Sequence, residues 1–192
     1  MDIEKIKEDI IFKDTIRGLE LTFHSTWGLF SPREVDAGSR LLIEFMEVNE
    51  SDICLDMGCG YGVIGLSMAK LAPSGKVYMI DKDFVAVEYA KKNVIINRLT
   101  NCEVFLSNAF SHIPDDIRFD VIASNLPANV GKEMLYIILS DAKRYLKKGG
   151  RLYVVTIAGL REFIKRNFKE IFGNYEKVKQ GREHAVHLGI KD

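Results

Sequence analysis

A glycine-rich turn between two carboxylates is the first group of residues whose types and spacing could do chemistry. Asp56 ends an apolar run, and Met57-Gly58-Cys59-Gly60-Tyr61-Gly62 follows it directly. Because glycine has no Cβ, such a turn lets the backbone approach a ligand closely where a strand leads into a helix. Asp81 closes the next apolar run, where a carboxylate can accept the hydroxyl protons of a ribose. The spacing therefore predicts a site for a ligand that contains a ribose.

Alternating strands and helices must position these residues. The runs expected as strands are 52–56, 76–80, 103–106, 120–124 and 151–156, and the expected helices are 63–71, 84–97, 132–146 and 160–172. Gly149-Gly150 is expected to end the third of these helices. Two weaker strands, near 175–179 and 183–188, could form an antiparallel hairpin. We therefore expect an α/β fold with a doubly wound, mostly parallel seven-stranded sheet and a C-terminal antiparallel hairpin.

The composition is that of a globular protein with one domain. The chain has 192 residues, of which 47% are hydrophobic and 28% charged, and its formal net charge is zero. We expect a single domain over 1–192, with an N-terminal segment and helix in 1–50 and the core in 51–192. The last third is basic, since residues 131–192 contain 14 Lys and Arg against 7 Asp and Glu. Such a surface could bind phosphates, although a solvated helix face explains it equally well.

The cysteines and the apolar runs indicate where the protein works. Three cysteines form an odd count without metal-ligand spacing, and the four histidines form no ligand motif. We expect no metal site and a reducing compartment, which favours the cytoplasm. The charged N-terminus does not read as a signal peptide, and no apolar run has membrane-spanning length. The oligomeric state cannot be read from the sequence.

The glycine turn fits two cofactors. Gly60, Gly62 and Gly65 form a literal G-x-G-x-x-G, and with Asp81 about 20 residues on this is typical of a nicotinamide dinucleotide. The carboxylate of Asp56 argues against it, because a pyrophosphate would be repelled there. The chain also offers no second domain for a dehydrogenase substrate. The stretch from Asp56 to Gly62 resembles the first motif, D-x-G-x-G-x-G, of class I methyltransferases at every defined position.

This resemblance implies that the cofactor is S-adenosylmethionine, whose positively charged methionine end suits a carboxylate at Asp56. It implies that Gly58 and Gly60 pass close to the cofactor, that Asp81 holds the ribose, and that Asn108 and Ala109 flank the adenine. The full set of expected cofactor-binding residues is Phe30, Ser31, Asp56, Gly58, Gly60, Tyr61, Gly62, Asp81, Lys82, Asn108, Ala109 and Asn125. Many family members carry Asp where this chain has Asn108.

A second motif, Asn125-Leu126-Pro127-Ala128, follows the fourth expected strand. It resembles the [DNS]-[PIL]-P-[YFW] motif of methyltransferases that act on amino groups of nucleobases and of glutamine. In those enzymes the polar side chain and the following backbone carbonyl accept hydrogen bonds from the target NH2. Two acceptors rehybridise the nitrogen and aim its lone pair at the methyl group, so positioning supplies most of the rate. The four residues are therefore the expected catalytic residues.

The N-terminal segment adds a resemblance to the small-subunit rRNA guanine-N2 methyltransferases. Residues 25–31, which contain Trp27 and end in Phe30-Ser31, and residues 35–42 are similar to that family's G-V-F-S and L-D-x-G-[ST]-x-L-L segments. By this likeness Phe30 and Ser31 would close over the cofactor. The chain departs from the family's Asn-Pro-Pro-Phe, because Ala128 has no ring to stack on a base. Stacking would then come from Phe110, Trp27 or Tyr136.

The most concrete interpretation is an S-adenosylmethionine-dependent methyltransferase that modifies an exocyclic amine of a base in RNA, with rRNA as the first substrate and partner. Guanine N2, cytosine N4 and adenine N6 stay open, and the small Ala128 leaves room for a second methyl group. A glutamine-N5 protein methyltransferase would use the same motif. A cofactor-binding protein without catalysis is a further alternative, which the presence of both Asp56 and Asn125 opposes.

Overall fold

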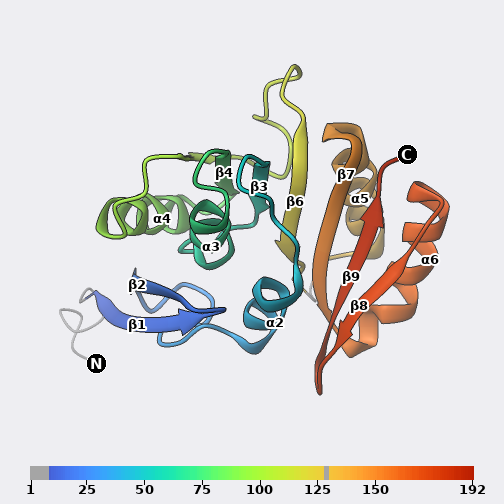
Figure 1. Ribbon diagram of the computed structural model, residues 1–192. Helices are drawn as coiled ribbons and strands as arrows, with labels where there is room; N and C mark the ends of the chain where they lie inside the picture. Colours follow the sequence, from blue (N-terminus) through green and yellow to red (C-terminus); the bar gives the residue numbers. More distant parts are fainter. Residues whose placement is uncertain (1–8, 128–129) are drawn as a thin grey trace.

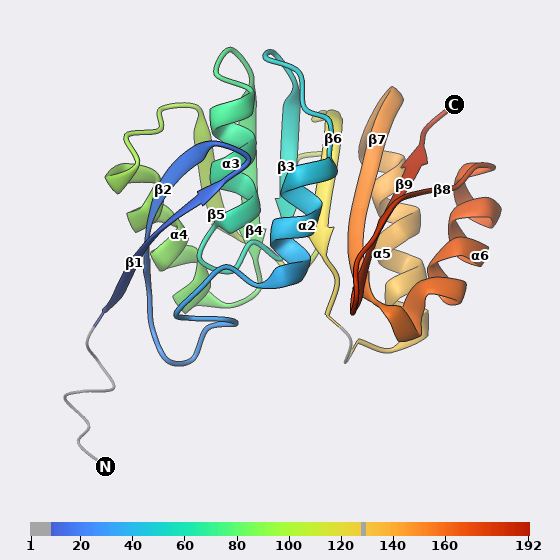
Figure 2. The ribbon, with the colours of Figure 1, turned by 60° about the horizontal axis from the view of Figure 1, so that its bottom comes forward.

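A seven-stranded sheet forms the centre of the protein (Figures 1 and 2). The computed structural model describes residues 9–127 and 130–192. The strand order is β5 (Cys102–Leu106), β4 (Lys76–Asp81), β3 (Ile53–Met57), β6 (Phe119–Asn125), β7 (Leu146–Ile157), β9 (His184–Ile190) and β8 (Glu176–Gln180). The first five strands run parallel, whereas β9 is antiparallel to both β7 and β8. The expected doubly wound fold with a C-terminal antiparallel hairpin is confirmed.

Helices cover both faces of this sheet. Helices α2 (Ala37–Phe45), α3 (Val63–Leu71) and α4 (Phe84–Ile96) contribute to one hydrophobic core, and α5 (Lys132–Tyr145) and α6 (Arg161–Phe172) to the other (Figure 2). A short 3-10 turn, η1 (Ala158–Leu160), precedes α6. Successive side chains of a strand point to opposite faces, so Cys54 packs into the first core and Leu55 into the second. This alternation explains why the parallel strands read as continuous apolar runs.

The carboxyl ends of the parallel strands meet at one edge of the sheet. From β3 the chain continues outward to β4 and β5, and it then returns to form β6 on the other side of β3. The strand order therefore reverses between β3 and β6. Ligands of open α/β sheets bind at such a switch point. The glycine turn follows β3, Asp81 ends β4 and Asn125 ends β6. The fold therefore brings the two predicted motifs to the same edge.

An N-terminal hairpin that the sequence analysis did not predict packs beside α3 and α4 (Figure 1). β1 (Ile10–Ile16) and β2 (Leu19–Ser25) pair through a two-residue turn in which Arg17 and Gly18 have φ angles of +51° and +76°. Two positive φ angles are the requirement of a type I′ hairpin turn. Asn93 of α4 donates to the backbone carbonyls of His24 and Tyr61 at 2.8 Å each. The hairpin is thereby tied to the glycine turn.

The glycine pair at 149–150 does not end a helix, and that prediction is wrong. α5 ends at Tyr145 and β7 begins at the next residue, so both glycines lie inside the strand. Gly149 has a φ angle of +74°, and a Cβ on Gly150 would lie 2.8 Å from the Lys147 carbonyl oxygen. The pair thus permits an irregular stretch of β7, where the register with β6 shifts after Phe119.

Two further findings concern membranes and metals. No helix in the described part of the chain is long and apolar enough to cross a membrane. Within residues 9–127 and 130–192, no group of three or more His, Cys, Asp and Glu side chains is arranged to hold a metal ion.

Candidate active site

The turn after β3 presents bare backbone at the switch point. Its glycines adopt left-handed conformations, with φ angles of +73° at Gly58, +54° at Gly60 and +102° at Gly62. The N–H groups of Gly58 and Cys59 donate to the Ile80 carbonyl at the end of β4, at 2.9 Å each. A Cβ built on Gly58 or Gly60 would meet no atom within 4 Å. The turn is therefore fixed by β4 and has room for a ligand against its backbone.

Gly65, the third glycine of the G-x-G-x-x-G pattern, has a packing role. It lies in the first turn of α3, where a Cβ would come within 2.3 Å of the Met79 sulfur on β4. Its N–H donates to Oδ2 of Asp56 at 2.7 Å. A side chain here would push the helix off the sheet and break this hydrogen bond. The pattern that suggested a dinucleotide is thus explained in part by helix–strand packing.

Asp56 is the most unusual polar group of the site. Its side chain is completely buried, and Oδ1 is the one buried side-chain oxygen or nitrogen among the described residues that has no hydrogen-bond partner. Burial raises the pKa of Asp56 to about 7; the Gly65 N–H opposes this shift and the nearby charge of Asp81 adds to it. A buried acceptor without a partner costs free energy. This oxygen is therefore suited to a ligand that brings a positive charge or a hydrogen-bond donor.

The raised pKa of Asp56 predicts how stability depends on pH. An unfolded Asp ionises near 3.8, whereas the folded protein keeps the Asp56 proton up to about pH 7. The folded state binds more protons in this range, so this group's contribution to stability falls as the pH rises from about 4 to 7. Asp56→Asn removes the contribution. Urea unfolding at several pH values should show the variant gaining on the wild type up to pH 7, and a difference that stays constant from pH 4 to 8 would contradict this account.

Asp81 connects the ends of two loops. Its Oδ2 accepts from the Gly60 N–H and its Oδ1 from the Asp83 N–H, both at 2.9 Å. The carboxylate is thus anchored by backbone while its remaining lone pairs stay available to a ligand. Lys82 beside it is exposed.

The loop after β5 lies at the same edge of the sheet. Asn108 is exposed, and Ala109 has a φ angle of +47°. This unusual conformation is held by Ser107, whose hydroxyl donates to the Ala109 carbonyl at 2.6 Å. Asn108 and Ala109 lie near the end of β4, because β5 neighbours β4 in the sheet, and their contact with an adenine stays a prediction.

Asn125, at the end of β6, is held by the N-terminal segment. Its Nδ2 donates to both carboxylate oxygens of Asp36, at 2.9 and 3.2 Å, and to the hydroxyl of Ser39 at 3.1 Å. Neither the Asn125 Oδ1 nor the backbone carbonyl of Leu126 accepts a hydrogen bond from a described residue. The Leu126 side chain is buried, its N–H donates to Val155, and Pro127 is exposed. Ala128 lies outside the described residues.

The N-terminal segment also reaches the glycine turn. The hydroxyl of Tyr61 donates to the backbone carbonyls of Ser31 and Glu34, at 2.9 and 3.2 Å. Burial raises the pKa of Tyr61, so this hydroxyl stays a donor. Tyr61 therefore ties residues 31–34 to the loop it belongs to. The ring of Phe30 is 73% exposed, so it is free to contact a ligand but does not cover the turn in this structure.

The three aromatic residues expected to stack on a base differ in their surroundings. Phe110 is buried and stacks on Tyr145 with the ring centroids 4.9 Å apart, so it belongs to the core and is not available to a base. Trp27 is partly exposed, and the guanidinium of Arg33 lies 4.3 Å from its ring centroid. Tyr136 lies on the outer surface of α5 and donates to Glu170 of α6. Of the three, Trp27 lies in the segment that reaches the site.

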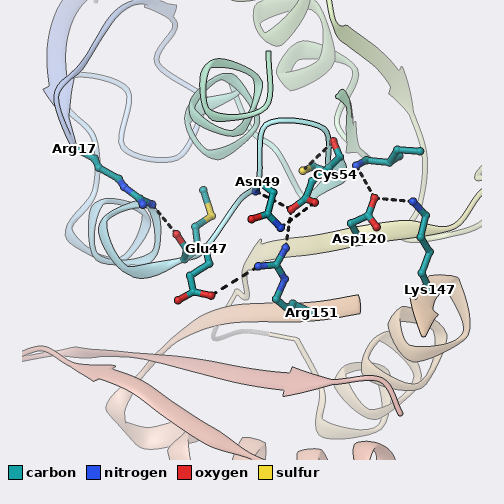
Figure 3. Close-up of polar contacts among 10 residues, drawn as sticks. Arg17, Glu47, Asn49, Cys54, Asp120, Lys147 and Arg151 are labelled. Atoms are coloured by element: carbon teal, nitrogen blue, oxygen red, sulfur yellow. Dashed lines mark hydrogen bonds and ion pairs between the residues drawn. The ribbon is translucent and has the colours of Figure 1, made fainter. Parts of the chain in front are cut away.

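A basic cluster within the last third of the chain, formed by Arg144, Lys147 and Arg151, lies at the opposite edge of the sheet from the glycine turn. Lys147 pairs with Asp120 at 2.7 Å and Arg151 with Asp52 at 2.6 Å, where β3, β6 and β7 begin (Figure 3). Arg144 pairs with Asp115. These cations are largely neutralised by partners. A phosphate-binding face beside the site is therefore not supplied by this cluster.

Sequence reasoning missed the roles of Asp36 and Ser39, although both lie in the segment that resembles the rRNA family. Asp36 is the N-cap of α2, since its carboxylate accepts the Ser39 N–H at 2.9 Å. Asp is one of the preferred N-cap residues, so its position ahead of the helix was a signal for the cap. Its contact with Asn125, 89 residues away, carries no local signal.

Two known proteins share sequence with most of this chain. The uncharacterized protein YbxB of Bacillus subtilis is 39% identical over 141 residues, which are 73% of this chain and 70% of that protein. The ribosomal RNA small subunit methyltransferase C of Haemophilus influenzae is 34% identical over 171 residues, which are 87% of this chain and 50% of that protein.

A solved structure of an rRNA methyltransferase has the same fold as this chain. The 16S rRNA N2-guanine methyltransferase of T. thermophilus, in complex with AdoMet and guanosine, superimposes with a TM-score of 0.85 at 27% identity, over 96% of this chain and 51% of that one. The chain thus spans about half the length of these two rRNA methyltransferases. The family model of the methyltransferase small domain matches residues 20–187. As the glycine turn and the Asn125 motif predicted, the chain belongs to this methyltransferase family.

Proposed function

We propose that this chain transfers the methyl group of S-adenosylmethionine to an exocyclic amino group of a base in ribosomal RNA. The observation that carries the proposal is the orientation of Asn125, whose NH2 group is fully engaged by Asp36 and Ser39. Its carbonyl oxygen accepts no hydrogen bond from a described residue, and the same holds for the backbone carbonyl of the next residue, Leu126. A pair of acceptors at a methyltransferase switch point suits a target with two N–H groups.

The residues at the edge of β3 and β4 fit S-adenosylmethionine. The unpartnered Oδ1 of Asp56 is suited to the positively charged methionine end. The open backbone at Gly58 and Gly60 leaves space for the ligand, and Asp81 retains lone pairs for the ribose hydroxyls. When bound, this cofactor supplies an electrophilic methyl group on a positively charged sulfur. The dinucleotide alternative gains no support, because a pyrophosphate would face the Asp56 carboxylate.

The chain's own contribution to the reaction is to bind and orient the amine. The carbonyls of Asn125 and Leu126 would each accept one N–H of the target amine. These two hydrogen bonds localise the nitrogen lone pair and direct it toward the methyl group. As the N–C bond forms, the bond between the methyl carbon and the cofactor sulfur would break, S-adenosylhomocysteine would leave with that electron pair, and the extra N–H proton would pass to water. Positioning of this kind lowers the barrier without a strong general base. Phe30, Ser31 and Trp27 are proposed to approach the ligands from the N-terminal segment.

Guanine N2 is the first position to test, because the T. thermophilus relative was solved with guanosine. Cytosine N4 and adenine N6 present the same pair of N–H groups and are outcomes of the assay. Because Ala128 lies outside the described residues, the choice between one and two methyl groups stays a prediction from the sequence. Methylation of rRNA would place the protein in the cytoplasm, as the unpaired cysteines suggested.

Ligand binding should raise the melting temperature. S-adenosylmethionine binds only the folded state, so at a hundredfold excess over Kd it should stabilise the protein by about 2.7 kcal/mol. For a domain of this size that corresponds to a shift of roughly 5–11 °C. The demethylated product should also stabilise, and NAD should not. A shift with NAD and none with either adenosyl ligand would refute the cofactor assignment.

The substrate is tested by transfer of radiolabelled methyl groups. Purified protein is incubated with labelled S-adenosylmethionine and with ribosomal subunits, protein-free rRNA or total cell protein. We expect label in rRNA, recovered after digestion as an N-methylated nucleoside. Label in a glutamine of a protein substrate, with none in RNA, would replace the proposal by the glutamine alternative.

A further inference from the structure

We infer that Asp36 is a positioning residue that fixes which side of the Asn125 amide faces the substrate. The inference deepens the proposed function, since it concerns the same acceptor. A carboxylate that is ionised can only accept hydrogen bonds, and both oxygens of Asp36 lie within 3.2 Å of Nδ2 of Asn125. The amide nitrogen must therefore face α2. Asn125 cannot rotate its amide by 180° without placing Oδ1 against the carboxylate.

Three features of the start of α2 fix the geometry around Asp36 and Asn125. It caps α2 by accepting the Ser39 N–H, so its own position is fixed by the helix start. Ser39 supplies the second acceptor for Asn125. Gly38, between them, lies under the ring of His184 at the start of β9, where a Cβ would come within 3.0 Å of that ring. Figure 2 shows α2 lying beside β6, which Asn125 ends.

The consequence is that the site selects its target base by whether the base donates or accepts a hydrogen bond at Asn125. An Asn that could flip would present NH2 to the target in part of the molecules and would then bind an oxo group. With its NH2 held by Asp36, Asn125 presents an acceptor alone. The site should therefore favour a base that carries an exocyclic amine and reject one that carries a carbonyl at that position. An unpaired polar group is costly in a closed site, which makes this a strong filter.

A carboxylate exchange tests the inference. In Asn125→Asp the residue can still accept from a substrate amine, but it places a second carboxylate against Asp36. Repulsion between the two carboxylates should displace the acceptor and lower turnover by ~10²-fold. In Asp36→Asn/Asn125→Asp the contact is restored with donor and acceptor exchanged, because the new amide donates to the new carboxylate. In this double variant the Oδ1 atom of the asparagine at position 36 can still accept the Ser39 N–H and cap α2. We expect turnover to recover to within ~10-fold of the wild type.

The single variant Asp36→Asn completes the cycle. It keeps the shape and the cap but allows the Asn125 amide to flip, so we expect lower turnover with unchanged affinity for S-adenosylmethionine. A purely structural role for Asp36 predicts instead that the double variant is worse than either single one. That result, or an Asn125→Asp enzyme as active as the wild type, would overturn the inference.

An NMR measurement separates this inference from the proposed function, because it needs no substrate. The side-chain amide protons of Asn125, assigned by their absence in Asn125→Ala, should exchange slowly with solvent in the wild type and faster in Asp36→Asn. Rapid exchange already in the wild type would refute the Asp36 contact. If the contact is present but no RNA or protein becomes methylated, the proposed function fails and the positioning role stands.

Discussion

Replacement of Asn125 by alanine is expected to lower the rate of methyl transfer by roughly 10²–10³-fold. The substitution removes one of two acceptors from the target amine, and the loss acts mainly in the transition state. We therefore expect kcat to fall with little change in the KM for S-adenosylmethionine, measured with labelled methyl groups on ribosomal subunits. An alanine variant of normal activity would mean that the Asn-Leu-Pro turn is structural.

The melting temperature of this variant is the necessary control, because Asn125 also contacts the first turn of α2 through Asp36 and Ser39. Ser124→Ala is the matched comparison on the same strand. Its hydroxyl donates to the Met57 carbonyl at 2.7 Å inside the sheet, so its loss should affect stability more than transition-state binding. A fall in kcat confined to Asn125→Ala would identify the amide as part of the reaction.

The largest loss of stability is expected from Arg151→Ala, at the edge of the sheet away from the site. The Arg151 guanidinium donates to Oδ2 of Asp52 at 2.6 Å, and Asp52 also accepts from the backbone and side chain of Asn49 (Figure 3). The two charged side chains are only 16% and 9% exposed. Removal of one partner leaves the other charge buried and unpaired, which costs about 3–5 kcal/mol.

Thermal unfolding gives the readout for this ion pair. The expected loss corresponds to a fall in Tm of about 6–20 °C for a domain of this size. Arg144→Ala is the control, because its pair with Asp115 is 59% and 84% exposed and should contribute at most about 1 kcal/mol. Equal losses in the two variants would show that burial of the Asp52 pair does not set its energetic weight.

The parallel half of the fold could be predicted from the sequence because its signals are local. The strands between 52 and 124 are short apolar runs, and each ends at a polar or glycine-rich segment. These ends meet at one edge for reasons of topology alone, so the order of motifs along the chain was enough to place Asp56, Asp81 and Asn125 together. The membership of the methyltransferase family followed from the same residues.

The features that were missed depend on contacts or on turn geometry. The local signals for the N-terminal hairpin are weak. They consist of a partial alternation in residues 10–25 and of Arg17-Gly18, where a positive φ angle at Arg17 could not be predicted from the residue type. Gly149-Gly150 wrongly predicts a helix end, because glycine favours both a C-terminal cap and a strand irregularity. The contact of Asp36 with Asn125 joins two distant segments, so a local pattern could not reveal it.

Nucleoside mass spectrometry of rRNA tests the central claim most directly. The rRNA of a strain that lacks this protein is compared with that of the same strain complemented by the wild type or by Asn125→Ala. The account predicts that one N-methylated base, N2-methylguanosine first, disappears in the deletion strain, returns with the wild type and does not return with Asn125→Ala. An unchanged set of methylated nucleosides in the deletion strain would contradict it.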